Sequence, residues 1–362
     1  MISGYLVGEK LFRNKFEAID AARGTAPKFY FQDEIWAKQD WLAPPDVPLR
    51  ELYRARAEQL RSKYDYIILA YSGGADSWNV LKTFDDAGIF LDEIVSYHDY
   101  GFTGDRLSKA SSEIFTVAEP VALDYVKRVP NSRFTLIDAK PLLLDVWART
   151  SAEELLSGYY VSPVSPLSPI RGGCFMHGVD RYQKLLESGK RVCLLWGFDK
   201  VHLKITDGRY CFQFIDYISQ AYAKSHLPVT DEFFYFSTDL PALLIKSCHQ
   251  VKSFLDRLPG KFIDPYPINL KAKKVAFQRS KTGHRVSFTT INALLYGWNP
   301  ATFSEGRFGG SPFLSEQDFW VLDHLSDPLV QKWATVVKMA ANYYKKAGVS
   351  SPIFSSRPYF IE

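Results

Sequence analysis

Cysteine is scarce in this chain of 362 residues, which has four, at positions 174, 193, 211 and 248. Cysteines so few and so widely spaced do not make a disulfide framework, which fits a reducing compartment. No apolar run approaches the about 20 residues that span a bilayer, and residues 1–5 lack the basic and then apolar pattern of a secretion leader. We therefore expect a cytoplasmic protein without a membrane partner, or one in the host cytoplasm if the source is a virus.

A strong charge of either sign is missing as well. The 44 basic and 40 acidic side chains give a net charge of +4, which neither requires nor excludes a nucleic-acid partner. Aromatic residues, in contrast, make up 15% of the chain. We expect them in the core and between domains, and base stacking against a nucleic acid stays open as the alternative.

The most informative segment lies where a predicted strand runs into a predicted helix. Residues 64–71 form a short apolar run, typical of a strand buried on both faces, and apolar residues at helical spacing predict a helix over 76–87. A glycine turn at such a junction directs backbone N–H groups and a helix N-terminus at one place, where phosphate binds well. The turn here is Ser72-Gly73-Gly74-Ala75-Asp76-Ser77.

Each residue type in this turn suits a nucleotide phosphate. The glycines can adopt a positive φ and have no Cβ to obstruct a polyphosphate. Ser72 and Ser77 can donate hydroxyl hydrogen bonds, and Asp76 can either cap the helix or hold Mg²⁺. The turn lacks a Gly-Lys-Ser/Thr ending, so it is not a Walker loop. The alternative is a glycine turn that only connects a strand to a helix.

The turn resembles the Ser-Gly-Gly-x-Asp-Ser loop of the PP-loop ATP pyrophosphatases, a superfamily that includes asparagine synthetase and phosphoadenosine phosphosulfate reductase. The resemblance covers about residues 63–225, and the remainder is similar only in a general way to phage-type PP-loop proteins. It implies ATP and Mg²⁺ as cofactors, with the loop holding the pyrophosphate of ATP while AMP is transferred to a substrate oxygen. The residues that we expect to contact ATP are Tyr71, Ser72, Gly73, Gly74, Ala75, Asp76, Ser77, His98 and Gly197.

A second element follows the strand predicted at 191–196. Superfamily members often carry a Gly-x-Asp turn after a late strand, facing the nucleotide, and Gly197-Phe198-Asp199-Lys200 stands in that place. By this resemblance Asp199 and Asp76 both bind Mg²⁺, and Lys200 neutralises charge that develops on the phosphates. A solvated polar turn is the alternative.

A glycine-rich turn with Arg171, Cys174 and His177 lies between these two elements. An Arg-x-x-Cys segment followed by a helix, a strand and a Gly-x-acid turn is similar to the reductase-like branch. Arg171 can clamp a phosphate or substrate group bidentately. Cys174 is expected to be a small buried hydrophobe, and Cys174-x-x-His177 is half of a zinc pattern without its second half. The chain lacks the Glu-Cys-Gly-Leu-His motif of the sulfonucleotide reductases, which argues against reduction itself. A sulfonucleotide-binding enzyme of the reductase-like branch is the nearest enzymatic alternative.

Alternating strand and helix patterns predict an α/β fold, namely a Rossmann-like, doubly wound parallel sheet of the PP-loop type with a mainly helical C-terminal region. We expect a lead-in segment with helices at 1–62, an ATP-binding domain at 63–225 and a helical substrate or lid domain at 226–362. The predicted strands of the ATP-binding domain are 64–71, 90–97, 133–138 and 191–196. The basic segment 271–285 is a lid over the triphosphate, a nucleic-acid contact or a solvated turn.

These patterns together predict an AMP-forming ATP pyrophosphatase. Its substrate oxygen attacks the α-phosphate, pyrophosphate leaves, and an amine, ammonia or a sulfur nucleophile then displaces AMP. The catalytic residues by this interpretation are Asp76, Arg171, Asp199 and Lys200. The substrate stays open between an amino acid, another small molecule, a nucleobase and a nucleic acid. A non-catalytic adenine-nucleotide-binding module is the alternative outside enzymes.

Overall fold

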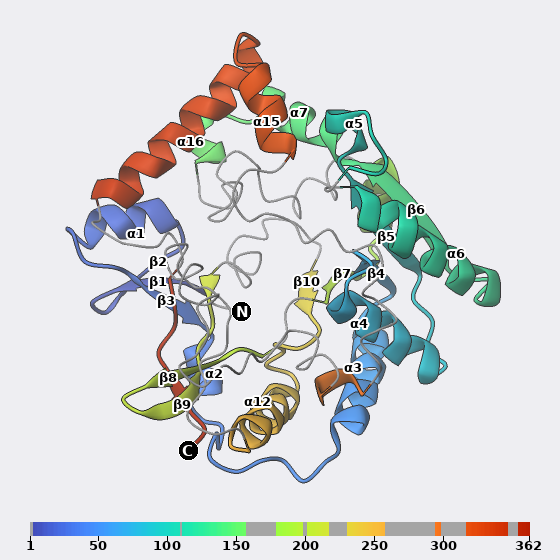
Figure 1. The fold of residues 1–362 in the computed structure, drawn as a ribbon, viewed down its shortest axis with the longest axis vertical. Coiled ribbons are helices and arrows are strands. Elements are labelled where there is room, and N and C mark those ends of the chain that lie inside the picture. Colours follow the sequence, from blue (N-terminus) through green and yellow to red (C-terminus); the bar gives the residue numbers. More distant parts are fainter. Residues whose placement is uncertain are drawn as a thin grey trace.

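A five-stranded, all-parallel sheet is the central element of the fold (Figure 1). The computed structural model describes residues 3–108, 111–156, 179–197, 201–216, 230–257, 294–297, 316–346 and 354–362. The strand order is β10-β7-β4-β5-β6, and every residue of β4 and β7 is buried, as expected for strands covered on both faces. The strands are β4 (Tyr66–Ala70), β5 (Glu93–His98), β6 (Arg133–Asp138), β7 (Val192–Trp196) and β10 (Thr230–Phe233).

Helices connect β4, β5, β6 and β7 in the alternation that the sequence predicts, whereas the described elements between β7 and β10 are strands. From β4 the chain moves outward through β5 to β6 and then returns to β7, on the other side of β4. The segment after β6 holds two helices, because Ser151 starts the second one by accepting a hydrogen bond from the Glu154 amide at 3.1 Å. The connecting helices are α4 (Ala75–Asp86), α5 (Tyr100–Thr103), a π-helical turn (Ile114–Ala118), α6 (Glu119–Arg128), α7 (Ala139–Arg149), α8 (Ala152–Leu155) and α10 (Asp180–Glu187).

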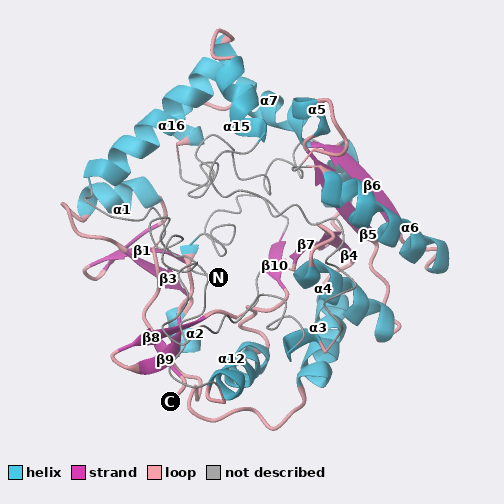
Figure 2. Ribbon diagram, in the orientation of Figure 1, coloured by secondary structure: helices cyan, strands magenta, loops and turns pink. Residues whose placement is uncertain are grey.

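Two small antiparallel sheets lie apart from the parallel sheet, as Figure 2 shows. The first has the order β2-β1-β3 and lies within residues 1–62, the segment for which the sequence predicts helices. Its strands are β1 (Ser3–Val7), β2 (Lys10–Phe12) and β3 (Lys28–Phe31), and its segment also holds α1 (Lys15–Ala21), α2 (Asp33–Trp36) and α3 (Leu49–Lys63). The second sheet has the order β11-β9-β8, with β8 (Leu203–Thr206), β9 (Arg209–Phe212) and β11 (Tyr359–Phe360).

The C-terminal region contributes to both kinds of structure. Helices α12 (Pro241–Leu255), α15 (Glu316–Asp323) and α16 (Pro328–Lys346) agree with the helical prediction. However, β10 lies beyond residue 225 and is still an edge strand of the parallel sheet, so that sheet extends past the expected boundary. One hydrophobic core runs from Tyr5 to Ile361. In the ranges that the structure describes, no helix is long and apolar enough to cross a membrane.

Candidate functional site

The Ser72–Ser77 turn lies at the carboxyl end of β4, where the strand order reverses. Strands β5 and β6 lie on one side of β4, and β7 and β10 lie on the other. The turn connects β4 directly to α4. Because the connections leave in opposite directions here, a crevice forms outside the strand ends, and ligands of open α/β sheets bind in such crevices. The fold therefore puts the turn where a ligand site is expected.

Hydrogen bonds within the turn hold its backbone in a tight curve. The Gly74 amide donates to Ser72 Oγ at 3.2 Å, the Ser72 amide donates to Ser77 Oγ at 3.3 Å, and Ser77 Oγ donates to the Gly74 carbonyl at 3.1 Å. Gly74 is the N-cap residue of α4, and no side chain among the described residues caps this helix. The interpretation of Asp76 as a helix cap is thus wrong. An uncapped N-terminus presents free backbone amides, which suits an anion at this helix end.

The two glycines of the turn differ in their conformation. Gly73 has φ +79°, and a Cβ there would lie 3.1 Å from the Ala118 amide nitrogen in the π-helical turn. Gly74 has φ −72° and ψ 159°, an extended conformation that other residues also adopt. The expected positive φ is therefore confirmed for Gly73 alone.

Gly197 brings the end of β7 against the turn. A Cβ built on Gly197 would lie 2.6 Å from the Ser77 Cα and 2.9 Å from the Ser77 amide nitrogen. No side chain fits between these two main chains, so glycine is required here for packing. The expected contact of Gly197 with ATP stays a prediction, and its described contact is with the backbone at the start of α4.

A small cavity of about 80 Å³ opens between this turn and the ends of β4, β5 and β7. Ala70 and Trp196 are register partners on neighbouring strands, so their side chains share one face of the sheet. The cavity is lined by Ala70, Tyr71, Ser72, Ser77, Tyr97, Ile114, Trp196 and Gly197. Its walls thus combine aromatic rings with the hydroxyls of the turn.

Tyr71 in the cavity wall and two serines in the segment before Ile114 have buried hydroxyls without a hydrogen-bond partner among the described residues. Tyr71 is 1% exposed, and its hydroxyl has no partner in the described part of the chain. Burial, and then the charge of Glu113, raise the pKa of Tyr71, so the hydroxyl keeps its proton. The Oγ atoms of Ser111 and Ser112, at the start of the helix that leads to Ile114, are buried without a partner in the same ranges. An unpaired buried donor is costly, and a bound acceptor such as a phosphate oxygen removes that cost.

Asp76 is surrounded by tyrosines from distant parts of the chain. The Tyr296 hydroxyl donates to Asp76 Oδ1 at 2.5 Å, and the Tyr235 hydroxyl donates to the Asp76 carbonyl at 2.8 Å. The rings of Tyr235 and Tyr296 are stacked at 5.8 Å, and Tyr53 packs against both. Burial, and then the charge of Asp76, raise the pKa of Tyr296 well above its ordinary value. Sequence reasoning missed these tyrosines, because no local pattern relates them to Asp76.

His98 lies beside the site at the end of β5. It is 8% exposed, its Nδ1 accepts the Tyr100 amide at 3.2 Å, and its ring packs against Phe115 at 5.0 Å. Burial lowers the pKa of His98, although the charges of Asp138 and Asp99 act in the opposite direction. His98 does not line the cavity described above.

A buried carboxyl on β10 is a second feature that sequence reasoning missed. Trp196 Nε1 donates to Asp231 Oδ1 at 2.8 Å, and burial raises the pKa of Asp231 to about 7. The other predicted site residues lie outside the described residues: Arg171, Cys174, His177, Asp199, Lys200 and the basic segment 271–285. Within the described ranges, no group of three or more His, Cys, Asp or Glu residues is placed to hold a metal ion.

Comparison with known proteins adds no relative to this picture. No protein-family model matches the chain, and no curated protein matches it either. The candidate site is therefore defined by the geometry of its own residues.

Proposed function

We propose that the protein binds ATP at the Ser72–Ser77 turn and cleaves it to AMP and pyrophosphate, as a PP-loop ATP pyrophosphatase. One observation carries this proposal: a Ser-Gly-Gly-Ala-Asp-Ser turn occupies the point where the strand order reverses, at the N-terminus of a helix that no described side chain caps. Backbone amides and the helix dipole favour a polyphosphate there. The Rossmann-like sheet of the PP-loop type is part of the same proposal.

The residues of the turn act by binding and alignment. Amides at the start of α4 and the Ser72 hydroxyl donate to the phosphate oxygens, and the Tyr71 hydroxyl, unpartnered within the described ranges, is a further donor. A substrate oxygen forms a bond to the α-phosphorus, the bond from that phosphorus to the pyrophosphate oxygen breaks, and pyrophosphate leaves. A nucleophile then attacks the adenylated group and AMP leaves. Fixed donors stabilise the charge that develops during both steps.

The described residues do not form a Mg²⁺ site by themselves. Proteins commonly bind Mg²⁺ of ATP through one or two carboxylates and the phosphate oxygens. The turn supplies one carboxylate, Asp76, and its Oδ1 accepts the Tyr296 hydroxyl. The second predicted ligand, Asp199, lies outside the described residues.

A nucleotide-binding module without catalysis is the second candidate. The Tyr296 contact favours it, because a carboxylate that already accepts a tyrosine hydroxyl is less available to a metal ion. The two candidates differ in their products. The pyrophosphatase releases AMP and pyrophosphate when a substrate is present, whereas the module binds ATP and leaves it intact.

The test separates binding from chemistry. Affinity for α,β-methylene-ATP is measured by calorimetry, and pyrophosphate release from ATP is measured with pools of carboxylic acids and with hydroxylamine as the trapping nucleophile. Gly74→Val is expected to lower nucleotide affinity by more than about tenfold, because the side chain occupies the space of the phosphate. Its fold is expected to survive, because the backbone conformation of Gly74 also suits valine. Unchanged affinity in a folded variant contradicts the binding site, and wild-type binding without any cleavage selects the module.

A further inference from the structure

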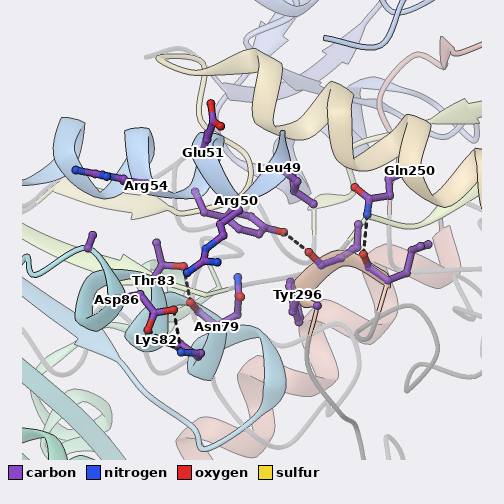
Figure 3. A pocket seen from close by; sticks show the side chains of 15 residues that line it. Leu49, Arg50, Glu51, Arg54, Asn79, Lys82, Thr83, Asp86, Gln250 and Tyr296 are labelled. Carbon is purple, nitrogen blue, oxygen red and sulfur yellow. Dashed lines mark hydrogen bonds and ion pairs between the residues drawn. The ribbon is translucent and has the colours of Figure 1, made fainter. Parts of the chain in front are cut away.

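A second cavity lies beside α4, away from the small cavity at the strand ends. It has a volume of about 740 Å³ and is enclosed by α3, α4, α12 and the segment 294–297 (Figure 3). Small-molecule sites commonly have volumes of a few hundred to about 1,000 Å³. The proposed ATP chemistry does not use this cavity.

The walls of the cavity combine apolar and aromatic surface with a few polar groups. Tyr53 and Tyr296 provide aromatic rings, and Leu49 and Leu295 provide aliphatic surface. The Tyr53 hydroxyl donates to the Leu295 carbonyl at 3.3 Å, which fixes that ring. Apolar walls with a few convergent polar groups are typical of sites for small organic molecules.

Among the described residues, the charges around the cavity leave one unpaired cation. Lys82 Nζ contacts both oxygens of Asp86, at 2.6 and 2.8 Å, and Arg54 pairs with Glu58 at 2.8 Å. The side chain of Arg50 has no hydrogen bond or ion pair within the described ranges. In Figure 3 this side chain extends from α3 toward Thr83 on α4, whereas Arg54 points away.

We propose that this cavity binds a small organic anion, with a carboxylate or phosphate group at Arg50 and a planar body against Tyr53 and Tyr296. A guanidinium group forms paired hydrogen bonds with either anion. Aromatic rings favour a flat apolar body over a flexible chain. Free carboxylates and organic phosphates share this chemistry, and the anion of the probe distinguishes them.

The cavity is connected to the proposed nucleotide site through one side chain. Tyr296 forms part of its wall and donates a hydrogen bond to Asp76 in the Ser72–Ser77 turn. A ligand that moves the Tyr296 ring also changes the hydrogen bonding of Asp76. This connection rests on the proposed function, and by linkage the two ligands alter each other's affinity by the same factor.

Binding is tested with two probes, 1-naphthoate and 1-naphthyl phosphate, in ligand-observed NMR titrations of the full chain. The wild type is expected to bind at least one probe with a dissociation constant on the order of 1 mM. Arg50→Gln is expected to weaken this binding roughly tenfold, because a charge-assisted hydrogen-bond pair is lost. Arg54→Gln is the matched control, since Arg54 also lines the cavity and is exposed, but is paired with Glu58. Absence of saturable binding up to about 10 mM, or equal weakening by both substitutions, overturns the proposal.

The connection is tested with α,β-methylene-ATP in the presence and absence of the bound probe. The probe is expected to change nucleotide affinity in the wild type and to have no such effect in Tyr296→Phe, which keeps the ring and loses the hydroxyl. The same effect in both proteins refutes the Tyr296 connection. Probe binding with no nucleotide binding in any protein refutes the proposed ATP site and leaves the cavity as an independent site.

Discussion

Substitution of Gly197 by alanine is the sharpest test of how the candidate site is assembled. The new Cβ would lie 2.6 Å from the Ser77 Cα, whereas carbon atoms in contact are normally about 3.5–4.0 Å apart. The overlap is thus about 1 Å, and both partners are main chain. No change of rotamer relieves it, so either the end of β7 or the start of α4 must move.

The expected cost follows from this geometry. Overpacking of a well-packed region typically costs about 1–3 kcal/mol, and a clash between two backbones belongs at the upper end. We expect Gly197→Ala to lower the free energy of unfolding by about 3 kcal/mol, measured by urea denaturation. A shift of about 1 Å in the turn is expected to reduce turnover on the order of 100-fold if the site is catalytic.

Gly189→Ala is the matched control. Gly189 has φ +77°, but a Cβ there would meet no described atom within 4 Å. Its cost is therefore conformational, about 1–2 kcal/mol, and the turn stays in place. Unchanged stability and nucleotide affinity in Gly197→Ala would refute the close approach. Loss of nucleotide affinity in Gly189→Ala would show that the affinity change does not come from the contact with Ser77.

Three further substitutions test separate parts of the structure. Burial raises the pKa of Asp231 to about 7. The folded state therefore keeps a proton that the unfolded state loses above about pH 4, and stability from this group falls as the pH rises from 4 to 7. By urea denaturation, Asp231→Asn is thus expected to be about 2–4 kcal/mol more stable than the wild type at pH 8 and about as stable at pH 4. Equal stability of the two proteins at both pH values contradicts the raised pKa of Asp231. Tyr71→Phe removes a hydroxyl without a described partner, so the ligand-free protein should be as stable as the wild type or up to about 1 kcal/mol more stable. Nucleotide affinity should fall, and unchanged affinity in calorimetry excludes the Tyr71 hydroxyl as a phosphate donor. Glu93→Gln removes the carboxylate that pairs with the partly exposed Arg181 and should cost about 1.5–3 kcal/mol in urea denaturation, with unchanged stability as the contrary result.

The parts of the fold that could be predicted are those with a local signal. The buried strand β4, helix α4 and strand β7 lie within a few residues of their expected ranges, because each has an apolar pattern of its own. Helix α4 also ends at a local signal, since Gly88 follows it with φ +67°. The order of these elements is sufficient to place the Ser72–Ser77 turn at the carboxyl edge of the parallel sheet.

Other parts had a signal that was not used. Asp207 and Gly208 both have a positive φ between β8 and β9, and an Asp-Gly pair between two apolar runs is a strong hairpin indicator. The aromatic run before Gln32 likewise forms β3. Strand β10 is harder to foresee, because its four residues include Asp231 and Glu232, two buried acids in a strand of the parallel sheet.

The environment of the turn could not be predicted, because it depends on residues that meet only in the folded chain. Tyr296 and Asp76 are 220 positions apart, and Tyr235 is 159 positions from Asp76. From the sequence, Asp76 is predicted to cap the helix or to bind a metal ion, because its neighbours in the chain suggest these roles. The structure adds a tyrosine hydroxyl at Asp76 Oδ1, because the chain beyond residue 225 returns to the face of α4, and the metal-binding role stays a prediction.

This arrangement makes the turn rigid on several sides before any ligand binds. Gly73 lies against Ala118 and Gly197 lies against Ser77, while the Tyr235 hydroxyl donates to the Asp76 carbonyl in the first turn of α4. Each contact comes from a different segment, so none of them arises from the local sequence of the turn. A preformed set of donors avoids the entropy of ordering a loop when the phosphate arrives. The Asp76 side chain connects the turn to the second cavity, because its partner Tyr296 also lines that cavity, and under the proposed function we expect control of nucleotide binding to act through this pair.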